Sequence, residues 1–147
     1  MSSQIFHVTA TFEAPVYATE RTERVIEAID TLAPEATVET QSGDERAPGT
    51  VVARTHSLER LSERFHEQAI LDSARTTMLD GLTPETNTVT FRLKKQAAYA
   101  DVVNFAVGDP DELGDITVTI TVSEGDPAAY VRQLAPPTED GVPVDDE

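Results

Sequence analysis

Residues 115–122 read Asp-Ile-Thr-Val-Thr-Ile-Thr-Val, and this stretch decides the class of fold. From Ile116 to Val122 every second residue is a β-branched apolar side chain, and threonines fill the positions between them. A period of two is typical of a β-strand with one buried face and one open face. The stretch predicts a strand whose isoleucines and valines enter a core while its threonines line the other side of a sheet.

Further stretches extend this sheet. Residues 88–94 alternate in the same way, and residues 4–13 alternate between apolar side chains and histidine or threonine. Residues 36–41 and 50–55 predict a short hairpin, because a polar segment containing Pro-Gly separates them. Residues 102–107 are a candidate for one more short strand.

Helical spacing of apolar residues recurs in three segments. Residues 19–34 begin at a threonine that can cap a helix and end at a proline that closes it. Residues 57–81 predict the longest helix, continuous from a serine to Gly81, which suits the left-handed position after a helix end. Residues 126–134 open with Asp-Pro, a good cap and first turn for a short final helix.

This order of elements predicts an α+β fold, with a mostly antiparallel sheet and helices packed on one face. Residues 1–134 are expected to form a single domain. Residues 135–147 contain three prolines, five acidic residues and no basic residue, so an acidic, disordered tail is expected there.

Charge is the strongest signal in the composition. The chain has 27 Asp and Glu against 11 Lys and Arg, a formal net charge of −16. In molar salt the screening length falls to about 3 Å, and carboxylates keep a surface hydrated, so the composition is interpreted as halophilic adaptation. An acidic protein that recruits basic partners is the alternative interpretation.

Several classes of function find no support in the sequence. The absence of cysteine excludes disulfides, thiolate nucleophiles and zinc ribbons. No nucleotide-binding loop, serine-hydrolase or zinc-protease motif occurs, so neither an enzyme nor a cofactor or metal site is expected. No stretch has the length and apolar character of a membrane span or signal peptide, so a cytoplasmic protein is expected.

One polar cluster stands out on the longest predicted helix. On a continuous helix, Gln68, Asp72 and Arg75 would project within the apolar arc that faces the core. An ion pair between Asp72 and Arg75 that ties down a neighbouring loop is one explanation. Contact with a ligand is the other.

A basic segment follows the predicted strand 88–94. Both lysines of the chain, Lys94 and Lys95, lie here beside Arg92, Gln96 and Tyr99, in a chain otherwise poor in positive charge. Arginine and lysine suit phosphate, and tyrosine can stack on a base. A solvated strand end would account for the same residues.

These residues also carry a family resemblance. Ile-Leu-Asp-Ser-Ala-Arg at 70–75, Lys-Gln-Ala-Ala-Tyr at 95–99 and Asn-Phe at 104–105 resemble the motifs of an archaeal family of uncharacterised proteins. That family is grouped with predicted RNA-binding, exosome-associated proteins. Its fold is similar to that of the large-subunit ribosomal protein that binds the smallest ribosomal RNA, and no enzymatic activity comes with the resemblance.

The resemblance and the basic segment together give the candidate site. The helix motif places Asp72 and Arg75 in it. The candidates for nucleic-acid contact are Arg92, Lys94, Lys95, Gln96, Tyr99, Asn104 and Phe105. The first hypothesis is an RNA-binding or RNA-processing accessory domain without catalytic activity. The alternative is a protein-interaction module or homodimer, and a metal-dependent hydrolase ranks last.

Overall fold

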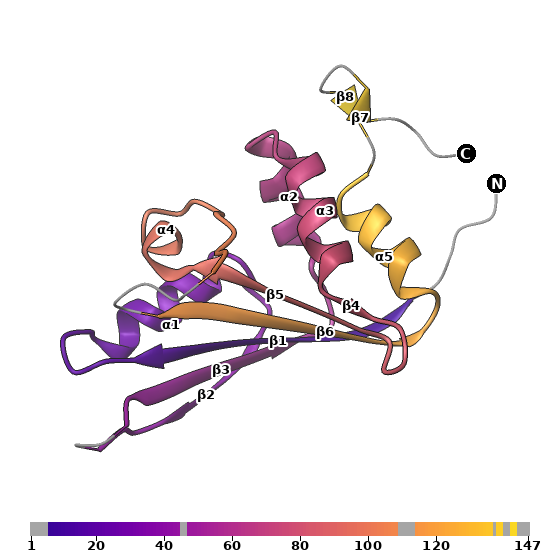
Figure 1. The fold of residues 1–147 in the computed structure, drawn as a ribbon. Helices are drawn as coiled ribbons and strands as arrows, with labels where there is room; N and C mark the ends of the chain where they lie inside the picture. The colour runs from indigo at the N-terminus through magenta and orange to yellow at the C-terminus, as the bar shows by residue number, and fades with distance from the viewer. Residues whose placement is uncertain (1–5, 45–46, 109–113, 137, 140–141, 144–147) are drawn as a thin grey trace.

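A computed structural model describes residues 6–44, 47–108, 114–136, 138–139 and 142–143, and Figure 1 shows their arrangement. Within them, six strands form one sheet in the order β2-β3-β1-β6-β5-β4, and every neighbouring pair is antiparallel. The strands are β1 His7–Val16, β2 Thr37–Gln41, β3 Gly49–Thr55, β4 Leu82–Thr83, β5 Thr88–Lys94 and β6 Asp115–Glu124. The expected α+β class with a mostly antiparallel sheet is confirmed.

The helices cover one face of this sheet, as Figure 1 shows. They are α1 Thr22–Asp30, α2 Glu59–Glu67, α3 Leu71–Asp80, α4 Lys95–Tyr99 and α5 Pro127–Leu134. Under them lie the alternating apolar residues of β1, β5 and β6, packed against fully buried helix residues such as Ile29 and Phe65. Burial of this shared apolar face is the main stabilising force of the domain.

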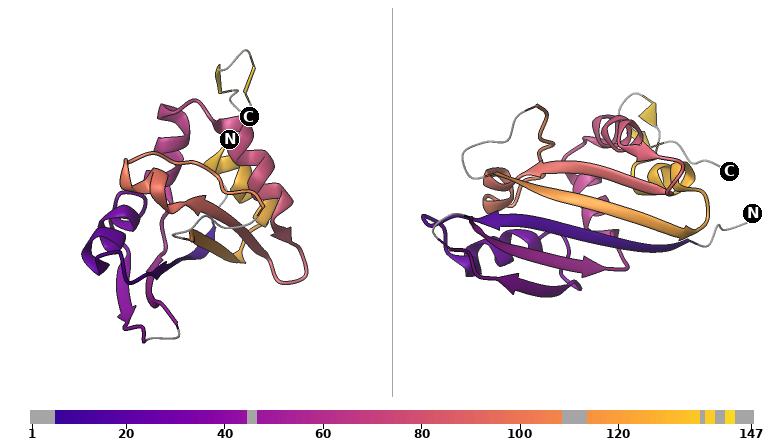
Figure 2. Two further views of the ribbon diagram at one scale, coloured as in Figure 1. Left: turned by 60° about the vertical axis from the view of Figure 1, so that its left-hand side comes forward. Right: turned by 60° about the horizontal axis from the view of Figure 1, so that its bottom comes forward.

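The opposite face of the sheet is not covered by helices (Figure 2, right). The strand register places the predicted threonines on this open face. Thr119 of β6 lies between Thr11 of β1 and Thr90 of β5 in the strand register, and none of the three is buried. The alternation seen in the sequence therefore gives the correct face of each residue. β1 continues to Val16, beyond the predicted end at residue 13, because it still pairs with Gly49 of β3 there.

The longest predicted helix is wrong, because α2 and α3 are separate. Ala69 has a φ of 57°, in the left-handed region. The Ala69 N–H donates to the His66 carbonyl at 3.1 Å and the Ile70 N–H to the Phe65 carbonyl at 3.0 Å. These two bonds form a Schellman motif, the usual end of an α-helix. No local signal predicts this break, because alanine favours helices and the left-handed conformation costs it about 1–2 kcal/mol.

Two predicted helix ends also differ. Arg21, not Thr19, is the N-cap of α1, and its side chain makes no capping bond. Gly81 has a φ of −92° and is not left-handed. Glycine is needed there because a Cβ would lie 1.9 Å from the Thr90 carbonyl oxygen. The cap of α5 is confirmed, since Asp126 accepts a 3.1 Å bond from the backbone of Ala129.

The segments after β5 and α5 complete the comparison. Residues 102–107 do not form the suggested strand and contribute one bridge, between Phe105 and Leu93. Of the expected tail 135–147, the described residues form two short paired strands, β7 Thr138–Glu139 and β8 Val142–Pro143, and much of the rest lies outside the described residues. Among the helices described, none is long and apolar enough to cross a bilayer.

Candidate functional site

A buried ion pair lies at the end of the sheet where α1 and α4 meet. Lys95 follows β5 directly and has no exposed surface. Its Nζ donates to Glu20 Oε1 at 2.8 Å and to the Pro15 carbonyl oxygen at 2.6 Å, and it lies 5.3 Å from the centre of the Tyr17 ring. The expectation that Lys95 offers its charge to a phosphate at the surface is therefore wrong for this structure.

Glu20 is the centre of this cluster. Its side chain is 5% exposed and accepts bonds from Lys95, from the Tyr99 hydroxyl and from the backbone N–H of Tyr17. Burial alone would raise the pKa of the Glu20 carboxyl, but these bonds outweigh it and hold the pKa below its usual value. Burial and the bond to Glu20 raise the pKa of Tyr99, so its hydroxyl remains a donor. The carboxylate is thus ionised and compensated by Lys95.

An open pocket of about 510 Å³ lies beside this cluster, lined by Thr19, Glu20, Arg21, Arg24 and Tyr99. We call it the α1–α4 pocket. Arg21 and Arg24 are exposed, and the Arg24 guanidinium lies 5.9 Å from the centre of the Tyr99 ring. Because Lys95 already compensates Glu20, the two arginines give the lining a net positive charge. This is a basic, aromatic pocket in a chain of net charge −16.

The remaining candidates of the basic segment lie in different surroundings. The Arg92 guanidinium is engaged on the open face, where it contacts Asp115 Oδ2 at 2.9 Å and the Gly108 carbonyl oxygen at 2.5 Å. Phe105 packs between Phe65 and Phe91, with ring centres 5.8 Å from each. Three of the seven candidates for nucleic-acid contact have accessible polar side chains, with no hydrogen bond or ion pair of the side chain among the described contacts. They are Lys94, Gln96 and Asn104.

The polar cluster predicted on the long helix does not face the core as a group. The chain changes direction at Ala69. The side-chain directions expected for one continuous helix therefore do not apply to residues on the two sides of the break. Gln68 forms two bonds to the backbone of Val103, at 2.8 and 2.9 Å. Asp72 is exposed and pairs with Arg75 at 2.8 Å, and Arg75 also donates to the Pro136 carbonyl oxygen at 3.0 Å. The described contacts of Gln68 and Arg75 tie neighbouring segments to the helices.

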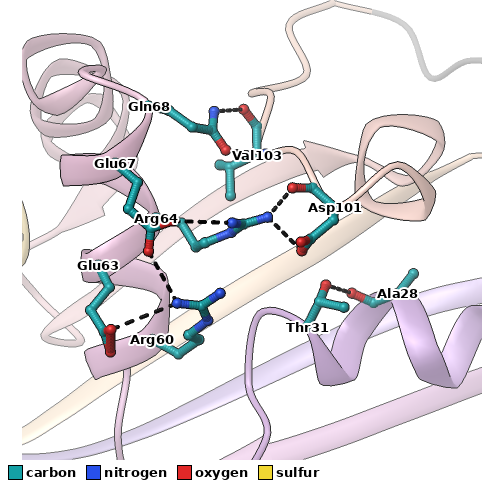
Figure 3. A network of polar contacts seen from close by, with 9 residues as sticks. All are labelled: Ala28, Thr31, Arg60, Glu63, Arg64, Glu67, Gln68, Asp101 and Val103. Atoms are coloured by element: carbon teal, nitrogen blue, oxygen red, sulfur yellow. Dashed lines mark hydrogen bonds and ion pairs between the residues drawn. The ribbon is translucent and has the colours of Figure 1, made fainter.

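Figure 3 shows how α2 holds the loop that follows α4. Arg64, almost fully buried, extends from α2 to Asp101, where it contacts both the carboxylate, at 2.5 Å, and the backbone carbonyl. Gln68 contacts Val103 further along the same loop. Asp101 adopts a left-handed φ of 60°, which Asp tolerates better than most residues. The network fixes the end of α4, and with it the position of Tyr99.

Sequence reasoning missed Glu20, Arg21, Arg24 and Arg64. No motif links residues 20–24 to residues 95–99. The two segments are far apart in the chain and come into contact only in the folded domain. One signal was available for the arginines: positive side chains in the first turn of a helix oppose the helix dipole, so Arg21 and Arg24 lie where intrinsic stability disfavours them. A function for the two side chains is one reason for such a placement.

The part of the chain that the structure describes contains no candidate metal site. No group of three or more His, Asp or Glu side chains is arranged there to hold a metal ion. Two of the histidines, His56 and His66, each face a backbone carbonyl oxygen, of Val8 at 3.0 Å and of Ser62 at 2.9 Å.

The fold and the pocket define a class of protein, an α+β domain with one helix-covered sheet face and a basic, aromatic pocket at one end of the sheet. A family model described as RNA binding matches residues 9–123. The chain belongs to this family, whose archaeal relatives carry the name UPF0201.

Three relatives show how far the similarity extends. A UPF0201 protein of Thermococcus kodakarensis is 41% identical over 136 residues, which cover 90% of this chain and 93% of the relative. The crystal structure of a UPF0201 protein from Methanococcus jannaschii has a TM-score of 0.85 at 34% identity, covering 93% of this chain and 99% of that one. A UPF0200/UPF0201 protein of Archaeoglobus fulgidus is 33% identical over 129 residues, 88% of this chain but 38% of its own length.

Proposed function

We propose that this chain binds RNA at the α1–α4 pocket, without catalysing a reaction itself. The observation that carries the proposal is the pairing of two exposed arginines with the ring of Tyr99, in a chain that is otherwise strongly acidic. The match of residues 9–123 to a family model described as RNA binding supports it. The same match covers both the Arg21–Arg24 turn and Tyr99.

The pocket combines the two chemistries that RNA offers. Arg21 and Arg24 supply guanidinium groups, which bind phosphate oxygens with two parallel hydrogen bonds. Tyr99 supplies an aromatic face on which an unpaired base can stack. Neither arginine forms an ion pair among the contacts that the structure describes, so binding a phosphate there requires no internal ion pair to be broken.

The basic segment contributes to this site in a different way from that predicted. Lys95 acts from below the surface, where it compensates Glu20 and so keeps the pocket from being acidic. Lys94, Gln96 and Asn104 remain candidates for direct contact with RNA, because their side chains are accessible. Arg92 and Phe105 hold the loop that follows α4.

Salt sets the balance between the two kinds of contact. We propose that the charge of −16 is an adaptation to molar salt, where the screening length is about 3 Å. Phosphate contacts weaken as counterions compete, whereas stacking on an aromatic ring is affected much less. In concentrated salt, stacking on Tyr99 would then provide most of the affinity.

The test is direct binding of a fluorescein-labelled, single-stranded RNA of twelve nucleotides, followed by fluorescence anisotropy from 0.1 M to 2 M KCl. We expect saturable binding, with a logarithm of the association constant that falls by about 1.4 to 2.1 for each tenfold rise in salt, as two or three cation contacts predict. Inorganic polyphosphate of matched charge is the control and should bind more weakly, because it has no bases. Absence of saturable RNA binding at every salt concentration would contradict the proposal.

Docking on another protein is a second candidate function. It is favoured by the Archaeoglobus fulgidus relative, in which the matched region is 38% of a longer protein with a double family name. Val107, which is 85% exposed, is an apolar side chain that a partner could cover. Light scattering measures the molar mass of the purified chain in solution. A monomeric mass with no co-purifying protein would contradict this second function.

A further inference from the structure

We infer that the α1–α4 pocket accepts one unpaired nucleotide of an RNA strand, and not the backbone of a duplex. The inference rests on the proposed function and deepens it by naming the form of RNA that the site selects. It follows from three properties of the pocket: its size, the spacing of its two arginines and the fixed orientation of its aromatic wall.

The size of the pocket suits one nucleotide. Sites for small ligands generally range from about 300 to 1,000 Å³. At about 510 Å³, the α1–α4 pocket lies within that range and has room for a ligand the size of one nucleotide. A duplex presents its bases only at their edges, so it could not place a base face on the Tyr99 ring.

The two arginines are placed to bind a single phosphate group. Arg21 is the N-cap of α1, Arg24 lies in its first turn, and both side chains line the same pocket. A groove that follows a nucleic-acid backbone instead has its cations distributed along its length. Two arginines that line one pocket beside one ring match a phosphate and the base attached to it.

The aromatic wall is held in place before any ligand arrives. The Tyr99 hydroxyl donates to Glu20, and Glu20 is fixed in turn by the buried Lys95. From the other side, the Arg64 contact to Asp101 fixes the loop at the end of α4 (Figure 3). Pre-organisation of this kind lowers the entropy cost of binding.

Arg24 defines how a base would enter. Its guanidinium carbon lies 5.9 Å from the centre of the Tyr99 ring. A base can stack on this face of the ring only if the Arg24 side chain moves outward, and Arg24 is exposed and long enough to do so. The geometry points to a base held between Tyr99 and Arg24, with its phosphate near Arg21.

The experiment uses the full chain and RNA that carries one 2-aminopurine, whose fluorescence falls when the base stacks. Binding should quench the probe in single-stranded RNA, and a perfect duplex of the same sequence should bind at least tenfold more weakly. Tyr99→Leu should abolish the quench and weaken binding of the single strand by roughly 5- to 150-fold, as loss of one stacked base predicts. Tyr99→Phe keeps the ring and should keep the quench.

The outcomes distinguish the single-nucleotide inference from the broader proposal of RNA binding. Equal binding of single strand and duplex, or a quench that persists in Tyr99→Leu, would overturn this inference while leaving RNA binding intact. Failure of every RNA to bind would overturn the proposed function and this inference with it. If Tyr99→Leu does not fold, comparison of single strand with duplex on the unmodified chain, together with the quench in Tyr99→Phe, still decides.

Discussion

Replacement of Lys95 by methionine is expected to lower the free energy of unfolding by about 3–5 kcal/mol, the usual cost of removing one partner from a buried ion pair. Methionine approximates the length of the lysine side chain, so the packing changes little. The change leaves the Glu20 carboxylate, 5% exposed, without its cation and the Pro15 carbonyl oxygen without a donor. Urea-induced unfolding, followed by circular dichroism at fixed high salt, measures the loss.

Two control variants identify the cause. Lys94→Met makes the same change at the adjacent, accessible position and should alter stability by no more than about 0.5 kcal/mol. Combining Lys95→Met with Glu20→Gln removes the uncompensated charge, keeps one amide oxygen to accept from the Tyr17 N–H and places an amide NH2 that can donate to the Tyr99 hydroxyl oxygen, so it should recover a large part of the loss. Equal stability of Lys95→Met and Lys94→Met would show that the buried pair is not formed in solution.

Replacement of both Arg21 and Arg24 by glutamine is expected to weaken RNA binding by about 100-fold at low salt. Each arginine would lose a charge-assisted hydrogen bond to phosphate, worth about 1.5 kcal/mol or more. Because two cation contacts disappear, the salt dependence of the logarithm of the association constant should also fall by about 1.4. Anisotropy titrations of a labelled single strand at several salt concentrations give both quantities.

The matched control is Arg54→Gln combined with Arg132→Gln. It removes the same number of positive charges from exposed positions on β3 and α5, away from the pocket lining. This variant should keep the affinity and most of the salt dependence of the unmodified chain. A comparable loss in both double variants would mean that RNA responds to net charge alone and not to the α1–α4 pocket.

Much of the fold follows from local patterns in the sequence. The alternation in β1, β5 and β6 identifies both the strands and their buried faces. Successive side chains of a strand point to opposite faces, so only one register places all the apolar residues in the core. The hairpin of β2 and β3 and the cap of α5 follow from turn and capping chemistry in the same way. The break between α2 and α3 was missed, because Ala69 adopts a conformation that tertiary contacts impose against its intrinsic preference.

The candidate site was predicted in part. Of the segment 92–99, Tyr99 forms the aromatic wall of the pocket, and Lys95 is buried against Glu20, another residue of the lining. The roles of the lysines could not be predicted, because nothing in the sequence indicates that Lys95 is buried against Glu20, 75 residues earlier in the chain. The positive charge of the pocket comes from Arg21 and Arg24, which only the packing of α1 beside α4 brings to Tyr99. Long-range contacts of this kind cannot be derived from spacing.

Photo-crosslinking tests the central claim most directly. The unmodified chain is irradiated with a 4-thiouridine-labelled single-stranded RNA in both dilute and molar salt, and the modified residues are identified by mass spectrometry. RNA binding at the α1–α4 pocket predicts crosslinks at Tyr99 and on the peptide that contains Arg21 and Arg24, at both salt concentrations. Crosslinks confined to the threonine-lined open face, or none at all, would contradict it.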